Sequence, residues 1–421
     1  MNESKFVKFC ALILLWLLAV TAHADSPHSS PRTILISFDG AQPHVIEELL
    51  RNKKLSGDGG FAVLIREGMR VDGMTSVLPT VTATNHITIA TGAYPEKTNI
   101  PANTFHDTEA PLTVTTSGFS APIDAETLWE AAKRQGKKVI TIAFAGADGR
   151  GDERRGDQTL GFGVRRGFSA VKLMNASHFD AASADAWDLG SQTCEFKKAN
   201  IGTATANQVF FNPSVGRVHL NVLVCDTAPE GKEGYDTAFF DFDKDLSNGF
   251  VARMRQGDWA PFALPLAPPA DPQFPDFASG VVGSWVKLLA FEPNLSAFNI
   301  YLGDVTHNVG YPQSFVAEIE KTVGFWPAEP DFFNLEGGRI DEATYMEQLE
   351  RLAVYLKDAM LFAMKNHDFD LLMGYPVQTD EAGHQCLLVD PRQQTFQDAD
   401  KRGRYGDYIE EAYRIADGNL K

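Results

Sequence analysis

The sequence predicts an α/β protein with a mainly parallel central sheet. Short apolar runs that end at turn residues alternate with helical segments in the first part of the chain, and the same alternation returns near the end. Strands that alternate with helices are typical of a parallel sheet with helices on both faces. The chain has 421 residues, of which 44% are hydrophobic and 22% charged. It is long enough to bury a large core without stabilising disulfides or bound metal ions.

In the first part of the chain, apolar runs and helical segments follow one another closely. Thr33 to Phe38 is a continuous apolar run that ends in Asp39-Gly40, as expected of a buried strand. Asp124 is a suitable N-cap for a helix that Gly136 ends. The predicted strands are 33–38, 71–78 (which breaks at Pro79) and 138–144, and the predicted helices are 59–69 and 124–135.

The middle of the chain departs from this alternation. Residues 217–225 and 237–242 are strand-like, whereas residues 259–277 contain so many prolines that no regular structure is expected there. We therefore interpret residues 150–290 as an irregular, β-containing insertion in the α/β domain. The sequence leaves open whether this insertion covers the site as a cap or makes no contact with a substrate.

The last part of the chain returns to the α/β pattern. Residues 296–302 and 369–374 are predicted strands, and a loop carrying Asp380 and His384 follows the second. In the predicted helix 344–366, Thr344 and Glu347 form a capping box. One apolar stripe along this helix predicts core packing: Leu349, Leu352, Ala353, Leu356, Met360 and Ala363. Residues 404–420 are a final amphipathic helix.

The first residues have the pattern of a signal peptide. Lys5 and Lys8 precede an apolar run, and Ala22-His23-Ala24 fits a cleavage site, so we expect residues 1–24 to be removed and the protein to be periplasmic or secreted. The alternative is an uncleaved membrane anchor. No other run has transmembrane length, so no stable membrane span is expected after cleavage.

Three cysteines would remain after Cys10 leaves with the signal peptide. Cys194 and Cys225 could pair in an exported protein. The alternative is three buried thiols, Cys386 included, because connectivity cannot be deduced from spacing. The formal charge of -17 argues against a nucleic-acid coat or an anionic membrane surface as partner, but not against a small phosphorylated substrate. The sequence does not indicate an oligomeric state.

Four polar residues lie just after predicted strands: Asp39, Thr82 at the start of a short helix, Asp380 and His384. Asn103 closes the segment that contains this helix. In open α/β sheets, ligands bind outside the carboxyl ends of the strands, so these side chains are expected to converge. Each one also has a purely structural interpretation. Asp39 suits a turn, Thr82 a helix cap, Asn103 a surface loop, and the Asp380/His384 pair a solvated turn. Together they favour a metal-assisted hydrolase.

These residues lie in motifs that resemble a known family. ILISFDG, PTVTATNHITIATGAYPE, Asn103 and DEAGH are similar to the type I phosphodiesterase/nucleotide pyrophosphatase family of the alkaline phosphatase superfamily. The resemblance runs from about Arg32 to the C-terminus and is strongest at 32–107 and 369–392. It implies an alkaline-phosphatase-like domain over residues 25–421, a three-layer sandwich into which residues 150–290 are inserted.

The resemblance also implies a role for each residue. Asp39 would bind one of two divalent metal ions, expected to be Zn²⁺, and Thr82 would be the nucleophile that bridges toward this ion. Asn103 would hold a phosphoryl oxygen, and Asp380 and His384 would bind the second ion. The reaction implied is hydrolysis of phosphodiester or pyrophosphate bonds in small, nucleotide-type substrates through a phosphothreonine intermediate.

The chain departs from the family pattern in two places. The family supplies three further metal ligands from an S-D-H-G turn and a later His, and neither feature occurs in these 421 residues. QCLLVDPR follows His384 where the family more often has Gly-Pro. We therefore expect a chain truncated at its C-terminus that is inactive or nearly so and poorly soluble.

Three other interpretations are compatible with the sequence. A truncated, catalytically dead remnant and a binding-only paralogue both fit the missing ligands. A phosphonate hydrolase of the same superfamily that uses Thr82 is a further alternative. A sulfatase is disfavoured because C/S-x-P-x-R is absent, and an alkaline phosphatase proper because Asp-Ser-Ala is absent at the nucleophile.

Overall fold

The computed structural model describes residues 31–180, 186–190, 204–211, 218–227, 234–266 and 280–421. The elements below lie in one compact unit, Ile34–Lys421, except for the first residue of strand β1. The expected signal peptide lies outside the described residues. In the described part, no helix has both the length and the apolar character to cross a membrane.

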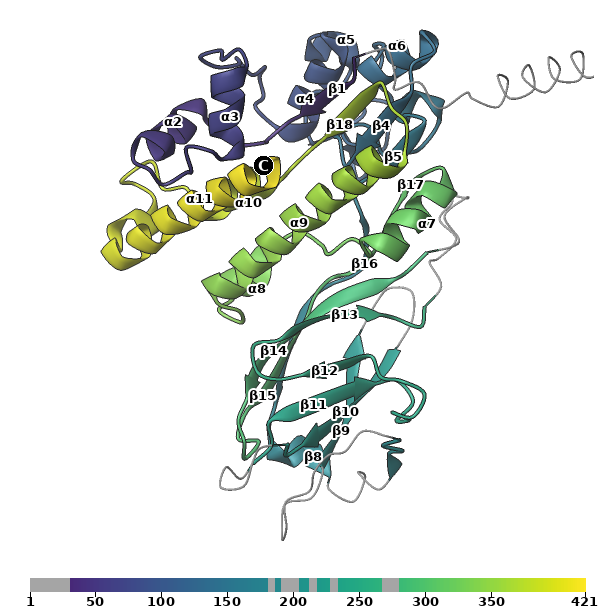
Figure 1. The fold of residues 1–421 in the computed structure, drawn as a ribbon, viewed down its shortest axis with the longest axis vertical. Coiled ribbons are helices and arrows are strands. Elements are labelled where there is room, and N and C mark those ends of the chain that lie inside the picture. The colour runs from purple at the N-terminus through teal and green to yellow at the C-terminus, as the bar shows by residue number, and fades with distance from the viewer. Residues whose placement is uncertain (1–30, 181–185, 191–203, 212–217, 228–233, 267–279) are drawn as a thin grey trace, which may run out of the picture. The chain divides into compact units, whose positions relative to one another are not determined.

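A five-stranded sheet forms the centre of the α/β part (Figure 1). Its strand order is β1 (Thr33–Ile36), β18 (Leu371–Gly374), β4 (Val139–Ile142), β5 (Gln158–Leu160) and β17 (Gly310–Tyr311). Strands β18, β4 and β5 pair in parallel, and β17 pairs with β5 antiparallel. The predicted mixed α/β fold is therefore confirmed, with parallel pairing at the centre of this sheet.

Side chains alternate along the buried strands of this sheet, so apolar side chains project from both of its faces. Helices cover both faces. Ile140 and Leu372 pack with residues of helices α7 and α9, whereas Val139 and Met373 pack with residues of α4 and α6. The four helices are α4 (Thr82–Thr91), α6 (Leu128–Arg134), α7 (Gln313–Thr322) and α9 (Glu342–Asn366). The apolar stripe predicted along α9 is buried in the structure.

The remaining helices surround this core. They are α2 (Pro43–Arg51), α3 (Gly60–Glu67), α5 (Pro95–Thr98), α8 (Phe332–Glu336), α10 (Gln378–Cys386) and α11 (Ala399–Leu420), with 3₁₀ turns at Asp152–Arg154, Ala176–His178 and Gln394–Gln397. Helix α11 packs against α10, α9 and α3. Its buried Asp417 accepts a hydrogen bond of 2.8 Å from the Phe61 backbone, which satisfies one of the free N–H groups at the start of α3.

Two further sheets form a β-rich region between β5 and β17. One has the order β12-β11-β10-β9-β8 and the other β6-β16-β14-β15-β7, with β13 paired to β14. The strands are β6 (Val164–Gly167), β7 (Ala170–Met174), β8 (Phe179–Asp180), β9 (Ala204–Phe211), β10 (Val218–Cys225), β11 (Thr237–Asp241), β12 (Ala252–Met254), β13 (Trp259–Ala263), β14 (Gly283–Phe291), β15 (Phe298–Leu302) and β16 (Val305–His307). A small ribbon, β2 (Thr104–Phe105) and β3 (Thr116–Ser117), lies outside this region.

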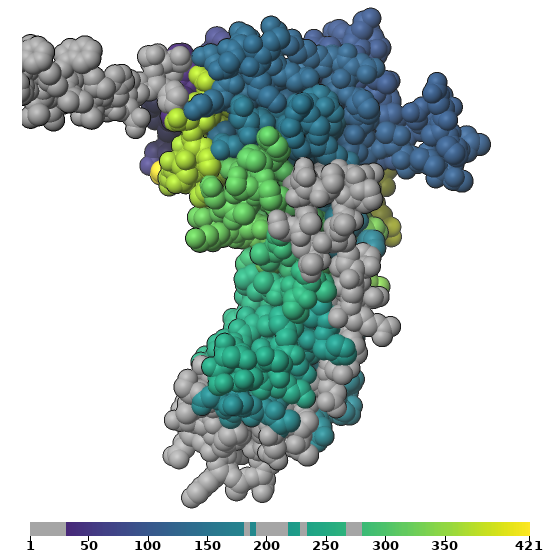
Figure 2. Space-filling model, turned by 90° about the vertical axis from the view of Figure 1, so that its right-hand side faces the viewer, coloured from purple at the N-terminus to yellow at the C-terminus, as the bar shows by residue number. Residues whose placement is uncertain are grey.

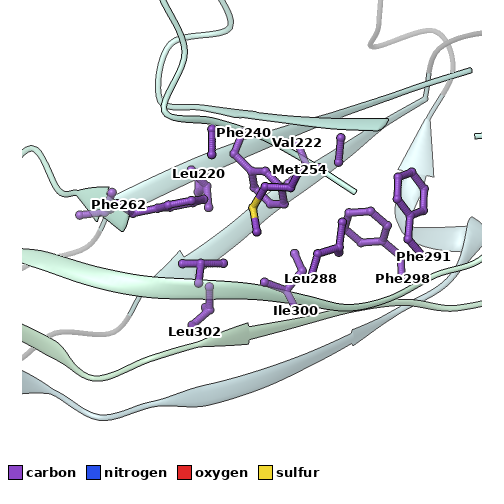
Figure 3. Packing of buried hydrophobic residues seen from close by; sticks show 14 of the residues in the cluster. Leu220, Val222, Phe240, Met254, Phe262, Leu288, Phe291, Phe298, Ile300 and Leu302 are labelled. Atoms are coloured by element: carbon purple, nitrogen blue, oxygen red, sulfur yellow. The ribbon is translucent and has the colours of Figure 1, made fainter. Parts of the chain in front are cut away.

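The two sheets of the β-rich region share one hydrophobic core. Leu220, Phe240 and Met254 of the first sheet face Leu288 and Ile300 of the second (Figure 3). The teal and green residues of these sheets form one continuous body in Figure 2. Burial of this apolar area supplies the driving force for the sheets to pack.

The two cysteines in the described residues differ in state. Cys225, at the end of β10, is disulfide-bonded, and its partner lies outside the described residues. Cys386 is a buried free thiol in α10. Cys194 falls in a part of the chain that the structure does not describe.

The N-cap residues of two helices differ from those that the sequence predicted. The cap of α6 is Thr127 rather than Asp124, and it forms a capping box with Glu130. The cap of α9 is Asp341, whose carboxylate accepts from the Thr344 backbone at 2.8 Å. In each case several adjacent residues had capping chemistry, and the pattern alone selected the wrong one.

Two predictions about strands were wrong. Residues 71–78 form no strand, and Val71 and Leu78 are exposed in the structure. Trp259–Ala263 does form a strand, although it contains Pro261 and was expected to be irregular. Strand β13 pairs with β14 alone among the described strands, and proline is tolerated on such an edge because no partner needs its N–H.

Candidate active site

One cavity of about 380 Å³ gathers the polar residues singled out from the sequence. Thr82, Asn103, Asp380 and His384 line it, and Asp39 adjoins it through a hydrogen bond to Thr82. These residues come from four separate places in the chain: the end of β1, the start of α4, the residue before β2, and helix α10. The structure therefore brings all five together at one end of the central sheet.

Thr82 is the first residue of α4, and its hydroxyl is not used as a helix cap. The cap position is Val81, which has no side-chain capping bond. The Thr82 hydroxyl instead donates to Oδ2 of Asp39 across 3.0 Å. Free N–H groups and the helix dipole at this position favour a negatively charged group beside the hydroxyl.

Asn103 is half-buried and is held against the same helix. Its Oδ1 accepts a hydrogen bond of 2.7 Å from the backbone N–H of Ala83. Because Oδ1 is used in this way, the Nδ2 group is the donor that Asn103 has left for a ligand in the cavity.

Asp39 is held by several neighbours at the end of β1. Its Oδ2 accepts from the Tyr375 hydroxyl at 2.8 Å as well as from Thr82, and its Oδ1 accepts from the Gly40 backbone at 2.9 Å. Gly40 has a φ of +67°, and a Cβ there would lie 2.9 Å from the Cα of Asp380. A glycine is therefore required for the chain after β1 to approach the start of α10 so closely.

Asp380 and His384 lie on a helix, not on the loop that the sequence predicted. Both belong to α10, and their spacing of one helical turn brings His384 Nε2 within 3.4 Å of Asp380 Oδ1. The His384 side chain is 76% exposed. Gly383 between them indicated a turn, but it lies inside the helix, where an added Cβ would meet nothing within 4 Å.

Several carboxyl groups face this cavity and raise one another's pKa. Burial, followed by the charge of Asp39, raises the pKa of Asp380 to about 6, although His384 opposes the shift. Burial, followed by the charges of Glu329 and Asp380, raises the pKa of Glu381 to about 8. Burial also raises the pKa of Glu329, a further carboxyl group in the cavity lining. No lysine or arginine lines the cavity in the described residues to balance these charges.

The donor types suit a divalent cation such as zinc. Carboxylate oxygens and an imidazole nitrogen are ligands that zinc accepts, and uncompensated carboxylates are the surroundings in which a cation is stabilised. In the described ranges, however, no three His, Cys, Asp or Glu side chains are grouped so that they could hold one ion. The chain offers two pairs instead: Asp39 with Thr82, and Asp380 with His384.

Eight residues that line the cavity were not predicted as site residues: Phe119, Phe162, Trp326, Glu329, Leu352, Tyr375, Val377 and Glu381. Phe162 packs edge-to-face on Phe119, Trp326 and Tyr375, with ring centroids 5.5–5.9 Å apart. Tyr375 directly follows a predicted strand and Glu381 lies in DEAGH, so both had a local signal. Phe119, Phe162, Trp326 and Glu329 had none, because they come from segments distant in sequence.

Comparison with known proteins confirms the resemblance. Residues 33–201 match the family model described as Type I phosphodiesterase / nucleotide pyrophosphatase. This segment includes Asp39, Thr82 and Asn103, and it ends before Asp380 and His384.

Two kinds of relative are similar to the chain. The bis(5'-adenosyl)-triphosphatase enpp4 of Mus musculus is 33% identical over 29% of this chain and 25% of its own length. The protein of the same name in Homo sapiens is 32% identical over 28% of this chain and 24% of its own. Venom phosphodiesterase 2 of Crotalus adamanteus is 35% identical over 27% of this chain and 14% of its own. The similarity thus spans a quarter or less of each relative.

Proposed function

We propose that this protein hydrolyses phosphodiester or pyrophosphate bonds in small, nucleotide-type substrates, with Thr82 as the nucleophile. The observation that supports this most is the position of Asp380 and His384. They lie outside the segment that matches the family, yet they line the same cavity as Thr82 and Asn103.

The first step of the proposed reaction is attack of Thr82 Oγ1 on phosphorus. The Oγ1–P bond forms while the bond from phosphorus to the leaving-group oxygen breaks, and the proton that leaves Thr82 Oγ1 ends on the leaving-group oxygen. Asn103 Nδ2 donates to a non-bridging oxygen, and the N-terminus of α4 stabilises the charge that develops there. The Thr82 hydroxyl already donates to Asp39, so its proton is directed away from the lone pairs that attack.

Water releases the phosphoryl group in the second step. A water oxygen bonds to phosphorus, the Oγ1–P bond breaks, and Thr82 regains its proton. We propose that Asp39 with Thr82 and Asp380 with His384 contribute ligands to two divalent ions, expected to be zinc. Bound ions would lower the pKa of the attacking hydroxyl and water and stabilise the oxygens of the displacement.

The family resemblance supports two further proposals. We propose an alkaline-phosphatase-like three-layer fold over residues 25–421, with residues 150–290 as an insertion. The helices on both faces of the central sheet are compatible with it. We also propose export after cleavage of residues 1–24, which N-terminal sequencing of the expressed protein would test.

Substitution of Thr82 tests the proposed reaction. Thr82→Ala should lose nearly all turnover of bis(4-nitrophenyl) phosphate in zinc-containing buffer, while Thr82→Ser should keep part of it. Mass spectrometry of acid-quenched reactions should find a phosphoryl adduct on Thr82. The matched control is Thr91→Ala, at the other end of α4, where the hydroxyl donates to the Ile87 carbonyl at 2.7 Å and accepts from the Ala93 backbone at 3.1 Å.

Three results would contradict the proposal: turnover in Thr82→Ala near that of the unchanged chain, an adduct on another residue, or no turnover by the unchanged chain with zinc supplied. The last result would favour a binding-only protein or the inactive chain that the missing metal ligands led us to expect. Faster turnover of an aryl phosphonate ester than of the diester would instead favour the phosphonate hydrolase.

A further inference from the structure

A second cavity, of about 670 Å³, lies between the β13–β14 pair and helix α9. On the sheet side, Trp259 and Pro261 alternate along β13, and Trp285 of β14 lies opposite Pro261 in the register. These three side chains therefore share one face of the sheet. This cavity is larger than the one beside Thr82, and the proposed function makes no use of it.

The opposite wall is a stripe along α9 that differs from its core stripe. Glu347, Glu350, Arg351, Val354 and Asp358 all line the cavity, and their spacings of three and four residues place them on one side of the helix. The segment from Val323 to Pro327 closes a third side. Most of the remaining lining is apolar, as expected of a site that binds the body of an organic molecule.

Arg351 is the central polar group of this cavity. Its Cζ lies 3.8 Å from the ring centroid of Trp259 and 4.4 Å from that of Trp285. Burial lowers the pKa of its guanidinium to about 10, although Glu347 opposes the shift. In the part of the chain that the structure describes, no oxygen accepts a hydrogen bond from Arg351 and no carboxylate forms an ion pair with it.

The stacked guanidinium has a defined ligand preference. Stacking on indole rings uses the flat face of the group and leaves the N–H donors in its plane. Those in-plane donors match the two oxygens of a carboxylate. A half-buried guanidinium without an oxygen partner gains most from a ligand that supplies one.

The neighbouring acids limit the charge of that ligand. Glu347 already accepts from Trp259 Nε1 at 2.7 Å and pairs with Lys287, and Asp358 pairs with Lys357 at 3.1 Å. Glu350 is exposed at the rim. These partners leave Arg351 as the group that attracts an anion, while the carboxylates nearby would repel a second negative charge.

We propose that this cavity binds an organic monoanion: a carboxylate that Arg351 holds, carried by an aromatic or branched aliphatic body that packs against Trp259, Trp285 and the apolar wall. The site is separate from the cavity beside Thr82, so the proposal stands or falls independently of the phosphodiesterase function. Doubly charged phosphate esters are disfavoured here.

Calorimetric titration of the whole chain tests the proposal. The probe is 4-phenylbutyrate, titrated with EDTA present so that no metal ion takes part. We expect saturable binding of one equivalent. The uncharged 4-phenylbutanamide and the doubly charged phenyl phosphate should bind at least about tenfold more weakly, because a charge-assisted bidentate pair contributes more than about 1.4 kcal/mol.

Variants assign the binding to Arg351. Arg351→Gln should weaken binding of 4-phenylbutyrate by about tenfold or more. The matched control is Arg253→Gln in the β-rich region, where Cζ of Arg253 lies 5.6 Å from the centroid of the Phe239 ring. Arg253→Gln and Thr82→Ala should both bind 4-phenylbutyrate as the unchanged chain does. Val354→Glu is the alternative variant if Arg351→Gln fails to fold. It keeps Arg351 stacked on the two tryptophan rings but puts a carboxylate into the cavity, so it should abolish binding of 4-phenylbutyrate.

Four results would overturn the proposal. The first is that the unchanged chain shows no saturable binding, and the second is that it binds the carboxylate and the amide equally. The third is that a folded Arg351→Gln or Val354→Glu protein binds the probe as well as the unchanged chain does. The fourth is that Thr82→Ala loses binding. The last result would place the probe in the cavity beside Thr82.

Discussion

The hydroxyl of Tyr375 donates a hydrogen bond of 2.8 Å to Oδ2 of Asp39. The same oxygen accepts from Thr82. Tyr375 therefore fixes the carboxylate that faces the proposed nucleophile, and it does so from the end of the neighbouring strand β18. Burial, followed by the charge of Asp39, holds the pKa of Tyr375 well above its usual value, so the phenol keeps the proton that it donates.

Tyr375→Phe should lower kcat/KM for an aryl phosphodiester by about tenfold, because a hydrogen bond to a charged group contributes roughly 1.5–3 kcal/mol and only part of this acts on the reaction. The ring contacts with His86 and Phe162 remain in the variant. The control is Tyr413→Phe, which removes an equally buried hydroxyl that accepts from the Gln42 backbone at 2.8 Å. Equal losses of activity in the two variants would exclude a positioning role for Tyr375.

Asn103 allows its two amide atoms to be tested separately. Asn103→Asp keeps the oxygen that accepts from Ala83 and adds a negative charge near the start of α4, so the melting temperature should not fall. Activity should fall by about 10²–10³-fold, because the Nδ2 donor is lost and the added charge repels a phosphoryl group. Thermal melting and steady-state kinetics measure the two effects.

Asn103→Ala separates these effects further, since it removes both atoms and should lower both stability and activity. Asn221→Asp, whose Nδ2 donates to the Phe242 carbonyl in the β-rich region at 3.0 Å, should leave kcat unchanged. An Asn103→Asp enzyme with normal turnover would show that Nδ2 does not stabilise the transition state.

Gly163 controls the position of Trp326 in the cavity wall. A methyl group at residue 163 would overlap the buried Trp326 ring, which packs against Phe162 and Tyr355. Gly163→Ala should therefore cost about 1–3 kcal/mol of unfolding free energy and raise KM, because the ring must move. The control is Gly403→Ala in α11, where nothing lies within 4 Å of the added methyl; it should stabilise by about 0.5–1 kcal/mol. Denaturant melts that rank the two variants in the opposite order would contradict this account.

Local patterns in the sequence predicted much of the α/β part. The apolar run before Asp39, the helix that begins at Thr82 and the stripe from Leu349 to Ala363 are each specified within a few residues, and each forms the predicted element in the structure. The strand before Asp39, however, is exposed or half-buried and not buried as predicted. A hydrophobic period of 3.6 residues and a continuous apolar run are both short-range signals, so they can be recognised without knowledge of the fold.

The walls of the candidate site could not be predicted in this way. Phe162 and Trp326 meet only because the β-rich region between them folds, and no local pattern specifies that meeting. Glu347 shows the same limit. It has the spacing of a capping box, yet in the structure its carboxylate accepts from Trp259 and pairs with Lys287. Tertiary partners distant in sequence override a weak local preference.

Glu320 of α7 should make stability depend on pH. Burial raises the pKa of its carboxyl to about 7, while the Val281 backbone, which donates at 3.3 Å, opposes the shift only in part. Because the folded-state pKa lies above the ordinary value of 4.5, the folded state binds the proton more tightly than the unfolded state does. The stability associated with the protonated carboxyl is therefore complete below about pH 4.5 and is lost as the pH rises toward about 7.

Glu320→Gln should remove this pH dependence, because glutamine is neutral throughout. At pH 8 we expect the variant to unfold with about 1–2 kcal/mol more free energy than the unchanged chain, a value reduced from the full shift because the carboxyl is partly exposed to solvent. At pH 4.5 the two should be nearly equal. Urea melts at the two pH values measure this, with Glu67→Gln, an exposed carboxyl beside Arg66, as the control that should show no such difference. A Glu320→Gln protein that is less stable than the unchanged chain at pH 8 would mean that the charged carboxylate makes a favourable contact, and that burial does not dominate its pKa.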